Sequence, residues 1–250
     1  MLKEPEILFE DKDILICRKP AGVATQTKRL GQQDMESLLK NYRVKKGEPP
    51  YIGIVHRLDQ PVEGLIVFAK NQQAAANLSK QVKDRVIGKY YYAVSVQELD
   101  SYDSEGVLED YLLTDKKTNF TQAVDVDELK RQGKEIPKDA KYAKLEWKRI
   151  KTLSKKSLFN IKLYTGRQHQ IRVQMANAGC PLIGDSKYGD ATDRQQLALC
   201  SYKLEFEHPS KKTPMQFEIQ PLGKVFAEFF IEEKIMKCEN LDNFAVFDYH

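Results

Sequence analysis

The chain lacks the features that mark membrane proteins and secreted, disulfide-bonded proteins. No apolar run approaches the roughly 20 residues that a bilayer-spanning helix needs, and acidic residues stand near the N-terminus where a signal peptide would be apolar. No CxxC spacing occurs, so neither a disulfide framework nor a zinc site is expected. The four cysteines are scattered at Cys17, Cys180, Cys200 and Cys238. We therefore expect a protein of the reducing cytoplasm that has no contact with membranes.

Motifs for the common cofactors and nucleophiles are also missing. There is no GxGxxG or GxxxxGK segment that would bind a nucleotide. No HxH or HExxH pair suggests a metal, and no serine or cysteine stands in a nucleophile elbow. The sequence therefore predicts chemistry that uses neither a cofactor nor a metal. No repeat or low-complexity linker divides the 250 residues, which leaves one large domain or two small ones.

The net charge of +4 says little about which partners the protein binds, but the charged residues are unevenly distributed along the chain. Residues 144–172 hold nine lysines and arginines against one acid, whereas residues 224–250 hold six acids and three bases. A basic stretch that also contains aromatic residues suits a polyanion such as RNA. The alternative is a lysine-rich hairpin that is merely solvated, and the charge pattern leaves both open.

Hydrophobic periodicity predicts strands and helices that do not alternate strictly. The predicted strands are 13–17, 64–69, 89–96, 143–150, 158–164 and a hairpin within 197–221. The predicted helices are 34–43, one capped by Asn71, one from its cap Thr165 to Gly179, and an amphipathic helix within 223–237. Because the strand pairs resemble hairpins, we predict an α+β fold with a largely antiparallel, mixed β-sheet flanked by helices and loops. The polar segment 98–141 is predicted to be a surface insertion.

Three short stretches place polar side chains where the pattern predicts burial or a tight turn. They are His56-Arg57-Leu58-Asp59, Lys89-Tyr90-Tyr91 and Gly166-Arg167-Gln168-His169-Gln170-Ile171-Arg172. A carboxylate at the entrance of a buried strand needs a partner, because burying an unpaired charge is costly. Arg57 and Arg172 are both candidates to pair with Asp59, since the guanidinium fork can bond both carboxylate oxygens.

Each of these residues also has a purely structural interpretation. Asp59 and an arginine could form an ion pair that only stabilises the fold, and His56, His169 and Tyr91 could be core side chains. A metal site built from His56, Asp59 and His169 has no supporting ligand spacing. One carboxylate, one tyrosine and one or two arginines remain on a basic face. That set suits nucleophilic or acid–base chemistry on an RNA base.

At these residues the sequence resembles the RluA family of pseudouridine synthases. "HRLDQPVEGLIVFAK", residues 56–70, resembles the family's catalytic motif, and "KYYYAV", residues 89–94, matches its Lys-x-Tyr-x-Ala motif. "LYTGRQHQIRVQMANAGCPLIGDSKYG", residues 163–189, resembles its Gly-Arg-x-His-Gln-Ile-Arg and Pro-Ile-x-Gly-Asp region. "RKPAGVAT", residues 18–25, matches its Lys-Pro-x-Gly segment. The motifs follow the family order and span about residues 7–221.

The resemblance implies the pseudouridine synthase fold and the isomerisation of uridine to pseudouridine within RNA, without a cofactor or a metal. It makes Asp59 the nucleophile that breaks the bond between uracil and ribose. Tyr91 matches the tyrosine that stacks on the target base and assists proton removal, and Arg172 the arginine that pairs with the aspartate. Arg57 matches the residue that fills the gap left by the flipped nucleotide. The side chains expected to contact RNA are His56, Arg57, Arg167 and His169.

The sequence departs from the family pattern in three places. Val62 and Glu63 stand where the family has Thr-Ser. A second carboxylate near Asp59 would oppose its ionisation if it pointed inward, and we expect Glu63 to point to solvent. The usual Leu-His-Ala is Leu199-Cys200-Ser201 here. Because the family motifs begin within about ten residues of Met1, we expect a single catalytic domain over residues 1–250 with no separate N-terminal RNA-binding module.

The choice of RNA is then expected to come from the catalytic core together with segment 98–141. From the family's range we expect ribosomal RNA rather than transfer RNA, and the absence of a binding module favours a monomer. An alternative is a catalytically inactive RNA-binding protein or RNA chaperone of the same fold. The intact set of Asp59, Tyr91 and Arg172 argues against it, because a protein that only binds RNA does not need the nucleophile.

Overall fold

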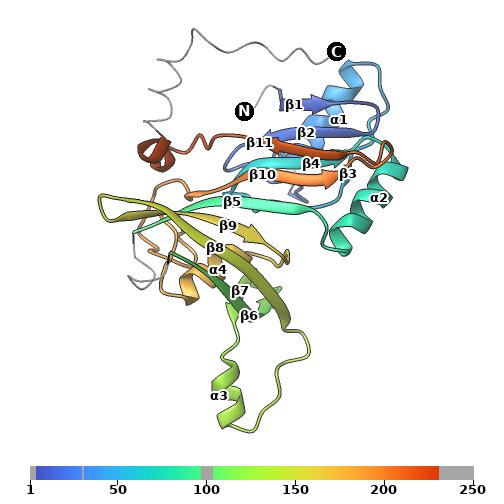
Figure 1. The fold of residues 1–250 in the computed structure, drawn as a ribbon. Helices are drawn as coiled ribbons and strands as arrows, with labels where there is room; N and C mark the ends of the chain where they lie inside the picture. The colour runs from blue at the N-terminus through green and yellow to red at the C-terminus, as the bar shows by residue number, and fades with distance from the viewer. Residues whose placement is uncertain (1–3, 30, 97–103, 231–250) are drawn as a thin grey trace.

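The computed structural model describes residues 4–29, 31–96 and 104–230, and within them an eleven-stranded mixed β-sheet forms the centre of the fold (Figure 1). The strands are β1 (Glu6–Glu10), β2 (Ile14–Lys19), β3 (Gly53–Ile54), β4 (Glu63–Ala69), β5 (Gly88–Ser95), β6 (Glu105–Asp115), β7 (Phe120–Ala123), β8 (Lys141–Leu153), β9 (Lys156–Leu163), β10 (Leu199–Glu207) and β11 (Pro214–Glu218). The helices are α1 (Met35–Lys45), α2 (Gln72–Lys83), α3 (Val126–Arg131) and α4 (Gln170–Asn177). Residues 224–230 are also helical. None of the helices in this part of the chain is long and apolar enough to cross a membrane.

The strand order β1-β2-β4-β10-β5-β9-β8-β6-β7 places β10 between two groups of strands (Figure 1). Strand β10 runs parallel to β4, with Cys200 opposite Glu63 and Ser201 opposite Gly64, and antiparallel to β5. The remaining strand pairs of the described chain are antiparallel. The predicted α+β fold with a largely antiparallel, mixed sheet is confirmed.

Side chains of the buried strands alternate between the two faces of the sheet. In β2, Leu15 and Cys17 belong to a core that includes residues of α1 and α4, whereas Ile14 and Ile16 pack with residues of α2 on the other face. The helical residues 224–230 cover another part of the sheet near β5 and β10. The face with α1 and α4 is the one toward which the predicted site residues point.

Most predicted elements are present, with shifts of one to three residues at their ends. Asn71 caps α2 as predicted, because its Oδ1 accepts a hydrogen bond of 2.8 Å from an amide of the first turn. The prediction that Thr165 caps a helix is wrong. Its hydroxyl instead accepts a bond from the Lys144 amide of β8, and the chain turns through residues 166–169 before α4 begins. Residues 231–237 of the predicted last helix lie outside the described residues.

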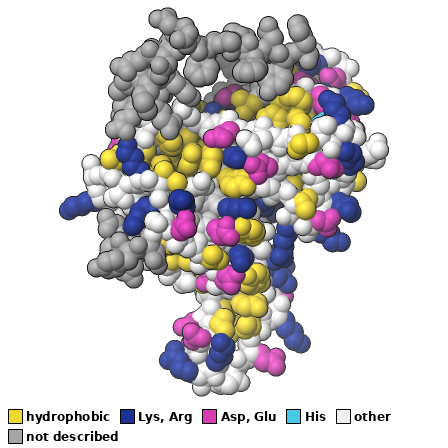
Figure 2. Space-filling model, in the orientation of Figure 1, with side chains coloured by type: hydrophobic (Ala, Val, Ile, Leu, Met, Phe, Trp, Pro, Cys, Tyr) yellow, Lys and Arg dark blue, Asp and Glu magenta, His cyan; other side chains and the backbone are white. Residues whose placement is uncertain are grey.

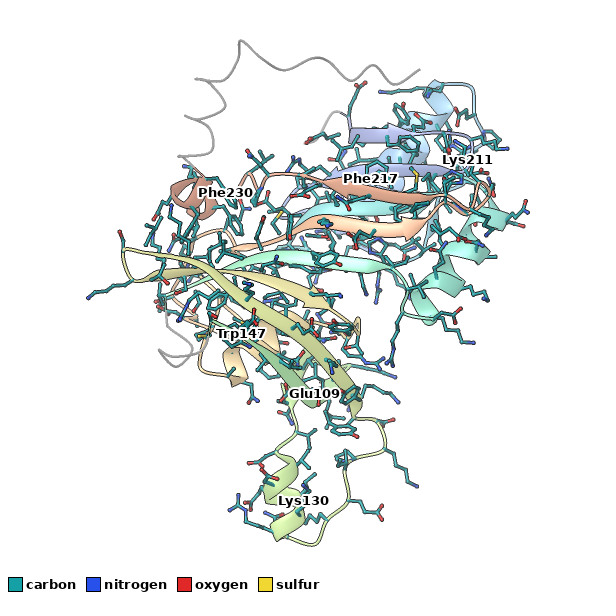
Figure 3. All side chains as sticks on the ribbon, in the orientation of Figure 1. Glu109, Lys130, Trp147, Lys211, Phe217 and Phe230 are labelled. Carbon is teal, nitrogen blue, oxygen red and sulfur yellow. The ribbon has the colours of Figure 1, made fainter. Side chains whose placement is uncertain are left out.

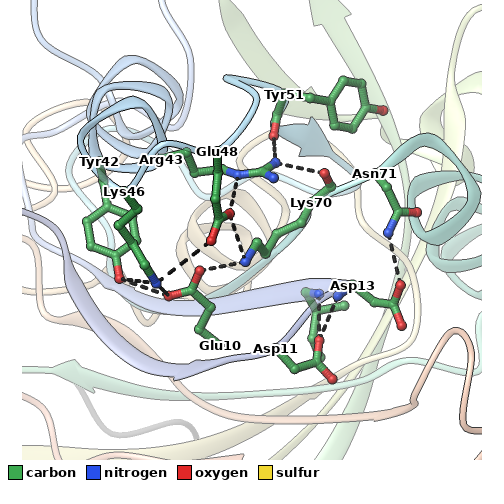
Figure 4. A network of polar contacts seen from close by, with 11 residues as sticks. Glu10, Asp11, Asp13, Tyr42, Arg43, Lys46, Glu48, Tyr51, Lys70 and Asn71 are labelled. Atoms are coloured by element: carbon green, nitrogen blue, oxygen red, sulfur yellow. Dashed lines mark hydrogen bonds and ion pairs between the residues drawn. The ribbon is translucent and has the colours of Figure 1, made fainter.

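A cluster of charged side chains ties α1 to the ends of β1 and β4 (Figure 4). We call it the Lys70 cluster, and its members are Glu10, Arg43, Lys46, Glu48 and Lys70. The Lys70 side chain is 6% exposed, and its ammonium lies 2.6 Å from a Glu10 oxygen and 3.1 Å from a Glu48 oxygen. Arg43 lies 3.1 Å from Glu48, and Lys46 lies 2.9 Å from Glu10. Each charge in the cluster therefore has an opposite charge in direct contact.

Part of segment 98–141 belongs to the sheet and part leaves it. Strand β6 pairs with β8 from Glu105 to Leu112. Residues 113–140, which we call the arm, follow this pairing. The β6–β7 hairpin at the start of the arm is still part of the sheet and lies near α4, whereas residues 124–140 extend away from the sheet, with α3 at the far end (Figure 1). Lys130 lies at that far end (Figure 3), and side chains of both charge signs are interspersed over it (Figure 2).

Candidate functional site

The three polar stretches line one cavity of about 420 Å³. The polar side chains predicted for a site and found at this cavity are His56, Arg57, Asp59, Tyr91, Arg167, His169 and Arg172. Its apolar wall includes Leu58, Val62, Leu163, Ile171 and Leu199. Residues that are more than a hundred positions apart in the sequence are thus brought together by β4, β5 and α4.

Asp59 lies on the loop between β3 and β4, and the segment after β2 holds this loop in place. The Leu58 amide donates to Thr25 Oγ1 at 3.2 Å, and the Thr25 hydroxyl donates to the Leu58 carbonyl at 3.0 Å. On the other side of Asp59, the Gln60 carbonyl accepts a bond of 2.8 Å from the Gly22 amide. The backbone is fixed on both sides of Asp59, while its side chain remains 28% exposed at the cavity.

Lys19 supports the same loop, and sequence reasoning assigned it no role. Its side chain is fully buried, and the ammonium donates to the carbonyl oxygens of Pro20, Val23 and Gln60 at 3.0, 2.6 and 3.1 Å. Burial lowers the pKa of Lys19 to about 7, against the opposing effect of carboxylates such as Asp59. The "RKPAGVAT" segment pointed to this lysine, but a sequence motif does not show which distant loop an ammonium reaches.

Arg172 is the arginine that faces Asp59. Its Nη1 lies 3.4 Å from Asp59 Oδ2, while Nε and Nη2 bond the two oxygens of Asp185, each at 2.7 Å. Although burial raises the pKa of Asp185, the hydrogen bonds from Arg172 outweigh it and hold that pKa below its usual range. Asp185 therefore orients the guanidinium, and the remaining nitrogen, Nη1, faces Asp59. Sequence reasoning missed Asp185, although it stands in the quoted "GDSKYG" stretch.

His169 approaches Asp59 from a left-handed backbone conformation, with φ of 54°. Its Nδ1 lies 2.6 Å from Tyr188 Oη, which accepts a bond of 3.0 Å from the Thr121 amide, and its Nε2 lies 3.9 Å from Asp59 Oδ2. With Thr121 donating to the phenol oxygen, the hydroxyl is oriented to donate to Nδ1, which favours a proton on Nε2 facing Asp59. Burial lowers the pKa of His169 against the opposing effect of Asp59, so the neutral form dominates at pH 7.

Tyr91 is 6% exposed and stands in the core that surrounds the cavity. Alternation along β5 turns Tyr90 and Tyr92 to the other face, as predicted. Burial and the nearby Asp59 carboxylate raise the pKa of Tyr91 well above its usual range. The phenol therefore stays protonated and offers a flat ring and a hydroxyl donor to a ligand.

Lys89 is an unpaired cation in the cavity wall. Burial lowers its pKa, and within the described chain it forms no hydrogen bond or ion pair. Its ammonium lies so close to Gly166 that a β-carbon there would stand 3.3 Å from it. An amine in this position suits an anionic or carbonyl oxygen of a bound ligand. The neighbouring His56 accepts a bond of 3.2 Å from the Val67 amide, and burial and Lys89 lower its pKa to about 3.

Arg57 and Arg167 lie at the rim of the cavity. Arg57 is exposed, and no carboxylate pairs with it in the described chain. Of the two arginines proposed as partners of Asp59, Arg172 is therefore the one in contact. Arg167 is half-buried and donates from Nε to the Tyr142 carbonyl at 2.8 Å, which leaves its terminal nitrogens near the opening. Both guanidinium groups are placed to meet a polyanion.

The expectation that Glu63 points to solvent is wrong. Its side chain is 3% exposed, and its oxygens accept bonds from the Gly223 and Leu222 amides at 2.9 and 3.3 Å. Those amides stand at the turn before the helical residues 224–230, so this carboxylate finds backbone donors that sequence spacing cannot reveal. The adjacent Gly64 has φ of +129°, and a β-carbon there would lie 2.3 Å from the Ser201 carbonyl oxygen. The close approach of β4 and β10 beside the site therefore requires glycine.

Possible metal ligands gather elsewhere in the described chain. Oxygen and nitrogen atoms of Asp11, Asp13 and His208 lie within 4.8 Å of one another. His208 Nδ1 accepts bonds from the amides of Ser210 and Lys211, so Nε2 carries the proton and donates it to Asp11 at 2.8 Å. Neither ring nitrogen then has a lone pair for a metal ion.

The cavity combines groups with distinct chemical capabilities. The backbone on both sides of Asp59 is held by hydrogen bonds, and its Oδ2 makes only long contacts with Arg172 and His169. A carboxylate in this position suits a nucleophile. Arg172 and neutral His169 can stabilise the negative charge of the carboxylate. Tyr91 and the apolar wall can hold a flat ring, and Lys89, Arg57 and Arg167 surround the opening with positive charge. The arrangement fits covalent chemistry on a planar base attached to a polyanion.

Comparison with known proteins identifies relatives along nearly the whole chain. The sequence profile of the RNA pseudouridylate synthase family matches residues 13–177. A protein of Helicobacter pylori described as an uncharacterized RNA pseudouridine synthase is 31% identical over 96% of this chain and 72% of its own length. A dual-specificity RNA pseudouridine synthase RluA of Vibrio vulnificus is 34% identical over 82% of this chain and 78% of its own. Ribosomal large subunit pseudouridine synthase C of Haemophilus influenzae is 32% identical over 86% of this chain and 64% of its own.

A solved structure has the same fold. Human RNA Pseudouridylate Synthase Domain Containing 4 superposes with a TM-score of 0.69 at 19% sequence identity, over 92% of this chain and 93% of the other. At that identity the likeness concerns the fold alone.

Proposed function

The chain belongs to the RluA family of RNA pseudouridine synthases and is an isomerase that acts on RNA; on this premise we propose that Asp59 is its nucleophile and that its substrate is structured ribosomal RNA. The observation that carries the assignment of Asp59 is its position. The carboxylate lies at the cavity with 28% of its side chain exposed, 3.4 Å from Arg172 and 3.9 Å from His169.

In the proposed reaction an Asp59 oxygen attacks C1′ of a uridine flipped out of the RNA. The C1′–N1 bond breaks, and uracil leaves with the electron pair of that bond. The freed base turns, C5 forms a bond to C1′, and the carboxylate leaves. The hydrogen on C5 is lost as a proton and N1 gains one, so that the product is an isomer of the substrate. No oxidant, reductant or second substrate is required.

The surrounding side chains have separate roles in this proposal. The Tyr91 ring stacks on the uracil, and its raised pKa keeps the phenol protonated. Tyr91 therefore assists the loss of the C5 proton by donating a hydrogen bond to the base, and it does not accept that proton itself. Arg172 contacts and orients Asp59, and Asp185 holds the guanidinium through two hydrogen bonds. Arg57 occupies the gap in the RNA stack, while His56, Arg167 and His169 line the space around the flipped nucleotide.

Ribosomal RNA is proposed because the relative in Haemophilus influenzae is named for the large ribosomal subunit. The dual-specificity name of the Vibrio vulnificus relative indicates that a related enzyme accepts more than one target. RNA affinity should fall as salt rises, because lysine and arginine contacts with phosphates release counterions. A binding constant that did not change with salt would contradict a basic RNA-binding face.

The direct test is tritium release from RNA labelled at uridine C5, because C5 loses its hydrogen when it bonds to C1′. Ribosomal and transfer RNA from a strain in which the gene is deleted serve as separate substrates, with wild type and Asp59→Ala side by side. Release by wild type from ribosomal RNA, and none by Asp59→Ala, is expected. Release by Asp59→Ala would refute the nucleophile, and release from transfer RNA alone would refute the substrate.

A further inference from the structure

We propose that the tip of the β6–β7 hairpin is a second RNA-contacting surface, on which Phe120 stacks against an unpaired base close to the flipped uridine. The surface consists of Lys116, Lys117, Phe120 and Lys187. The proposal rests on the proposed function, since it assumes that RNA occupies the neighbouring cavity. It assigns to part of the arm a role in selecting the RNA.

Phe120 is a large apolar side chain that the fold leaves in solvent. It is 39% exposed at the start of β7. One side of the ring packs against Tyr188, with the centroids 5.0 Å apart, and the Lys187 ammonium lies 5.8 Å from its centroid. The next residue, Thr121, is fully buried, so the backbone beneath the exposed ring is firmly placed. An exposed ring on a fixed strand is the kind of platform on which single-stranded nucleic acids stack.

The charges around the ring suit RNA. Lys116 and Lys117 are exposed at the hairpin turn, and in the described chain no carboxylate pairs with either of them or with Lys187. The one acid of the turn, Asp115, is occupied within it, because its oxygens accept bonds from the Lys117 amide at 2.8 Å and the Thr118 hydroxyl at 2.9 Å. Three lysines without a carboxylate partner in the described chain, beside an exposed aromatic ring, match a phosphate backbone with an unstacked base.

The hairpin tip is bonded directly to the motifs that line the cavity. Gln168 donates to the Asn119 side chain at 2.5 Å, and the Lys187 ammonium donates to the Asn119 carbonyl. Thr121 donates to Tyr188, Tyr188 contacts His169, and His169 contacts Asp59, with no step in this series longer than 3.9 Å. Phe120 is therefore only a few side chains away from the proposed nucleophile. A nucleotide flipped into the cavity would bring its neighbours in the RNA to this tip.

An unpaired base explains the site better than a protein partner does. A protein surface that covered Phe120 would have to leave the three lysines paired with acids or in water, whereas an RNA strand supplies a flat apolar ring and phosphates together. The stacking contact tolerates any base, so the tip would favour RNA in which the nucleotides next to the target are unpaired.

The test uses tryptophan as a reporter of stacking. The chain has one tryptophan, Trp147, which is 7% exposed. Phe120→Trp places a second indole at the tip, and Val107→Trp places one on β6 at a residue that is 50% exposed. Addition of ribosomal RNA from the deletion strain should quench the fluorescence of the first variant and leave the second largely unchanged. This fluorescence measurement depends on RNA binding and does not depend on turnover, so it remains informative even if Asp59 is not the nucleophile.

Kinetics separate a contact with RNA from a role in packing. Phe120→Ala should raise KM about tenfold and change kcat less than about threefold, because stacking of this kind contributes to binding, and Phe120→Tyr should restore KM. Lys116→Gln with Lys117→Gln should make the salt dependence of RNA affinity less steep, whereas Lys130→Gln with Lys134→Gln at the far end of the arm should not.

Three outcomes would overturn the proposal. Equal quenching of both indoles would mean that RNA coats the surface without a specific contact. A fall in kcat with KM unchanged in Phe120→Ala would assign the ring to support of Tyr188 and His169. An unchanged KM in Phe120→Ala, with turnover intact in wild type, would leave the proposed function standing and remove this surface from it.

Discussion

Two clusters of charged side chains in this protein have similar composition and different geometry. In the Lys70 cluster every carboxylate and every cation lies within 3.1 Å of at least one opposite charge (Figure 4). At the cavity, Arg172 contacts Asp185 at 2.7 Å but Asp59 only at 3.4 Å. Asp59 is thus the one carboxylate of the two clusters that is held by its backbone and left loosely paired at its side chain.

Under the proposed function, this difference in geometry separates a structural ion pair from a reactive one. When every carboxylate is in direct contact with a cation, the buried charges are stabilised but no carboxylate oxygen is free to contact a ligand. A reactive carboxylate needs a neighbour that favours its ionised form and an oxygen that a substrate can reach. Substitutions in the two clusters should therefore affect different measurements, which can be ranked by the size of the expected effect.

The largest effect is expected for Asp59→Asn. The amide has the same size but is a very weak nucleophile, so turnover should fall by more than about a thousandfold. The free energy of unfolding should change by less than about 1 kcal/mol, because the side chain is partly exposed and loosely paired. Tritium release and urea denaturation measure the two quantities. Near-normal turnover would show that Asp59 belongs with the structural carboxylates.

Lys70→Met should reverse that pattern. Removing the ammonium leaves Glu10 and Glu48 without their shared partner, and we expect a loss of about 3 kcal/mol in the free energy of unfolding. Turnover below the melting transition should stay within about twofold of wild type, because the cluster is remote from the cavity. Should the variant fail to fold, the milder Lys70→Arg allows the same comparison. A large loss of turnover in a stable variant would break the distinction between the clusters.

The Lys70 cluster should also make stability depend on pH in the acid range. Burial opposes ionisation of Glu10, but bonds from Lys70, Lys46 and Tyr42 outweigh it and lower its pKa from 4.5 to about 2. A lowered folded-state pKa means that this stability is present above about pH 4.5 and is lost as the pH falls toward 2, by about 2 to 3 kcal/mol. Urea denaturation at a series of pH values should show that loss in wild type. Glu10→Gln should have a shallower slope over the same range, and equal slopes would contradict the assignment.

The smallest of these effects is expected for Arg172→Lys. A lysine keeps the positive charge but cannot bond both oxygens of Asp185 while it reaches Asp59. We expect kcat to fall roughly 10- to 100-fold with little change in KM, because the charge remains and its orientation is lost. Single-turnover tritium release separates this loss from product release. An unchanged kcat would mean that charge alone is sufficient.

Sequence patterns predicted the parts of the fold that depend on local periodicity and capping. Alternation along β5 separated Tyr91 from its neighbours, and an asparagine before an apolar run marked the start of α2. The same reasoning wrongly predicted that Thr165 caps a helix, because its hydroxyl instead accepts a hydrogen bond from the Lys144 amide of β8. Glu63 misled it as well, because the amides that bury this carboxylate come from residues about 160 positions later in the chain.

The site was predictable as a set of residue types and less so as a set of contacts. The motifs contained Asp59, Tyr91 and Arg172, and the cavity brings them together. They could not indicate that Asp185 orients Arg172, or that Lys19 reaches the Gln60 carbonyl. Those contacts join segments through the tertiary fold, so no spacing rule within one segment can reveal them.

The central position of β10 has a consequence for how the protein acquires the proposed active site. Asp59 precedes β4, which lies with β1 and β2 on one side of β10. Tyr91 lies on β5, and Arg172 on α4, with the strands on the other side. Strand β10 is the one that pairs with both β4 and β5. Pairings between residues so distant in sequence close late in folding, because the entropy of a long loop must be overcome first.

During synthesis, the strands on both sides of β10 therefore leave the ribosome before β10 itself does. A chain halted before Leu199 would contain Asp59, Tyr91 and Arg172 but lack the strand that brings the two groups together. The enzyme becomes competent to act on RNA only after Leu199–Glu207 has been synthesised and has joined the two groups of strands.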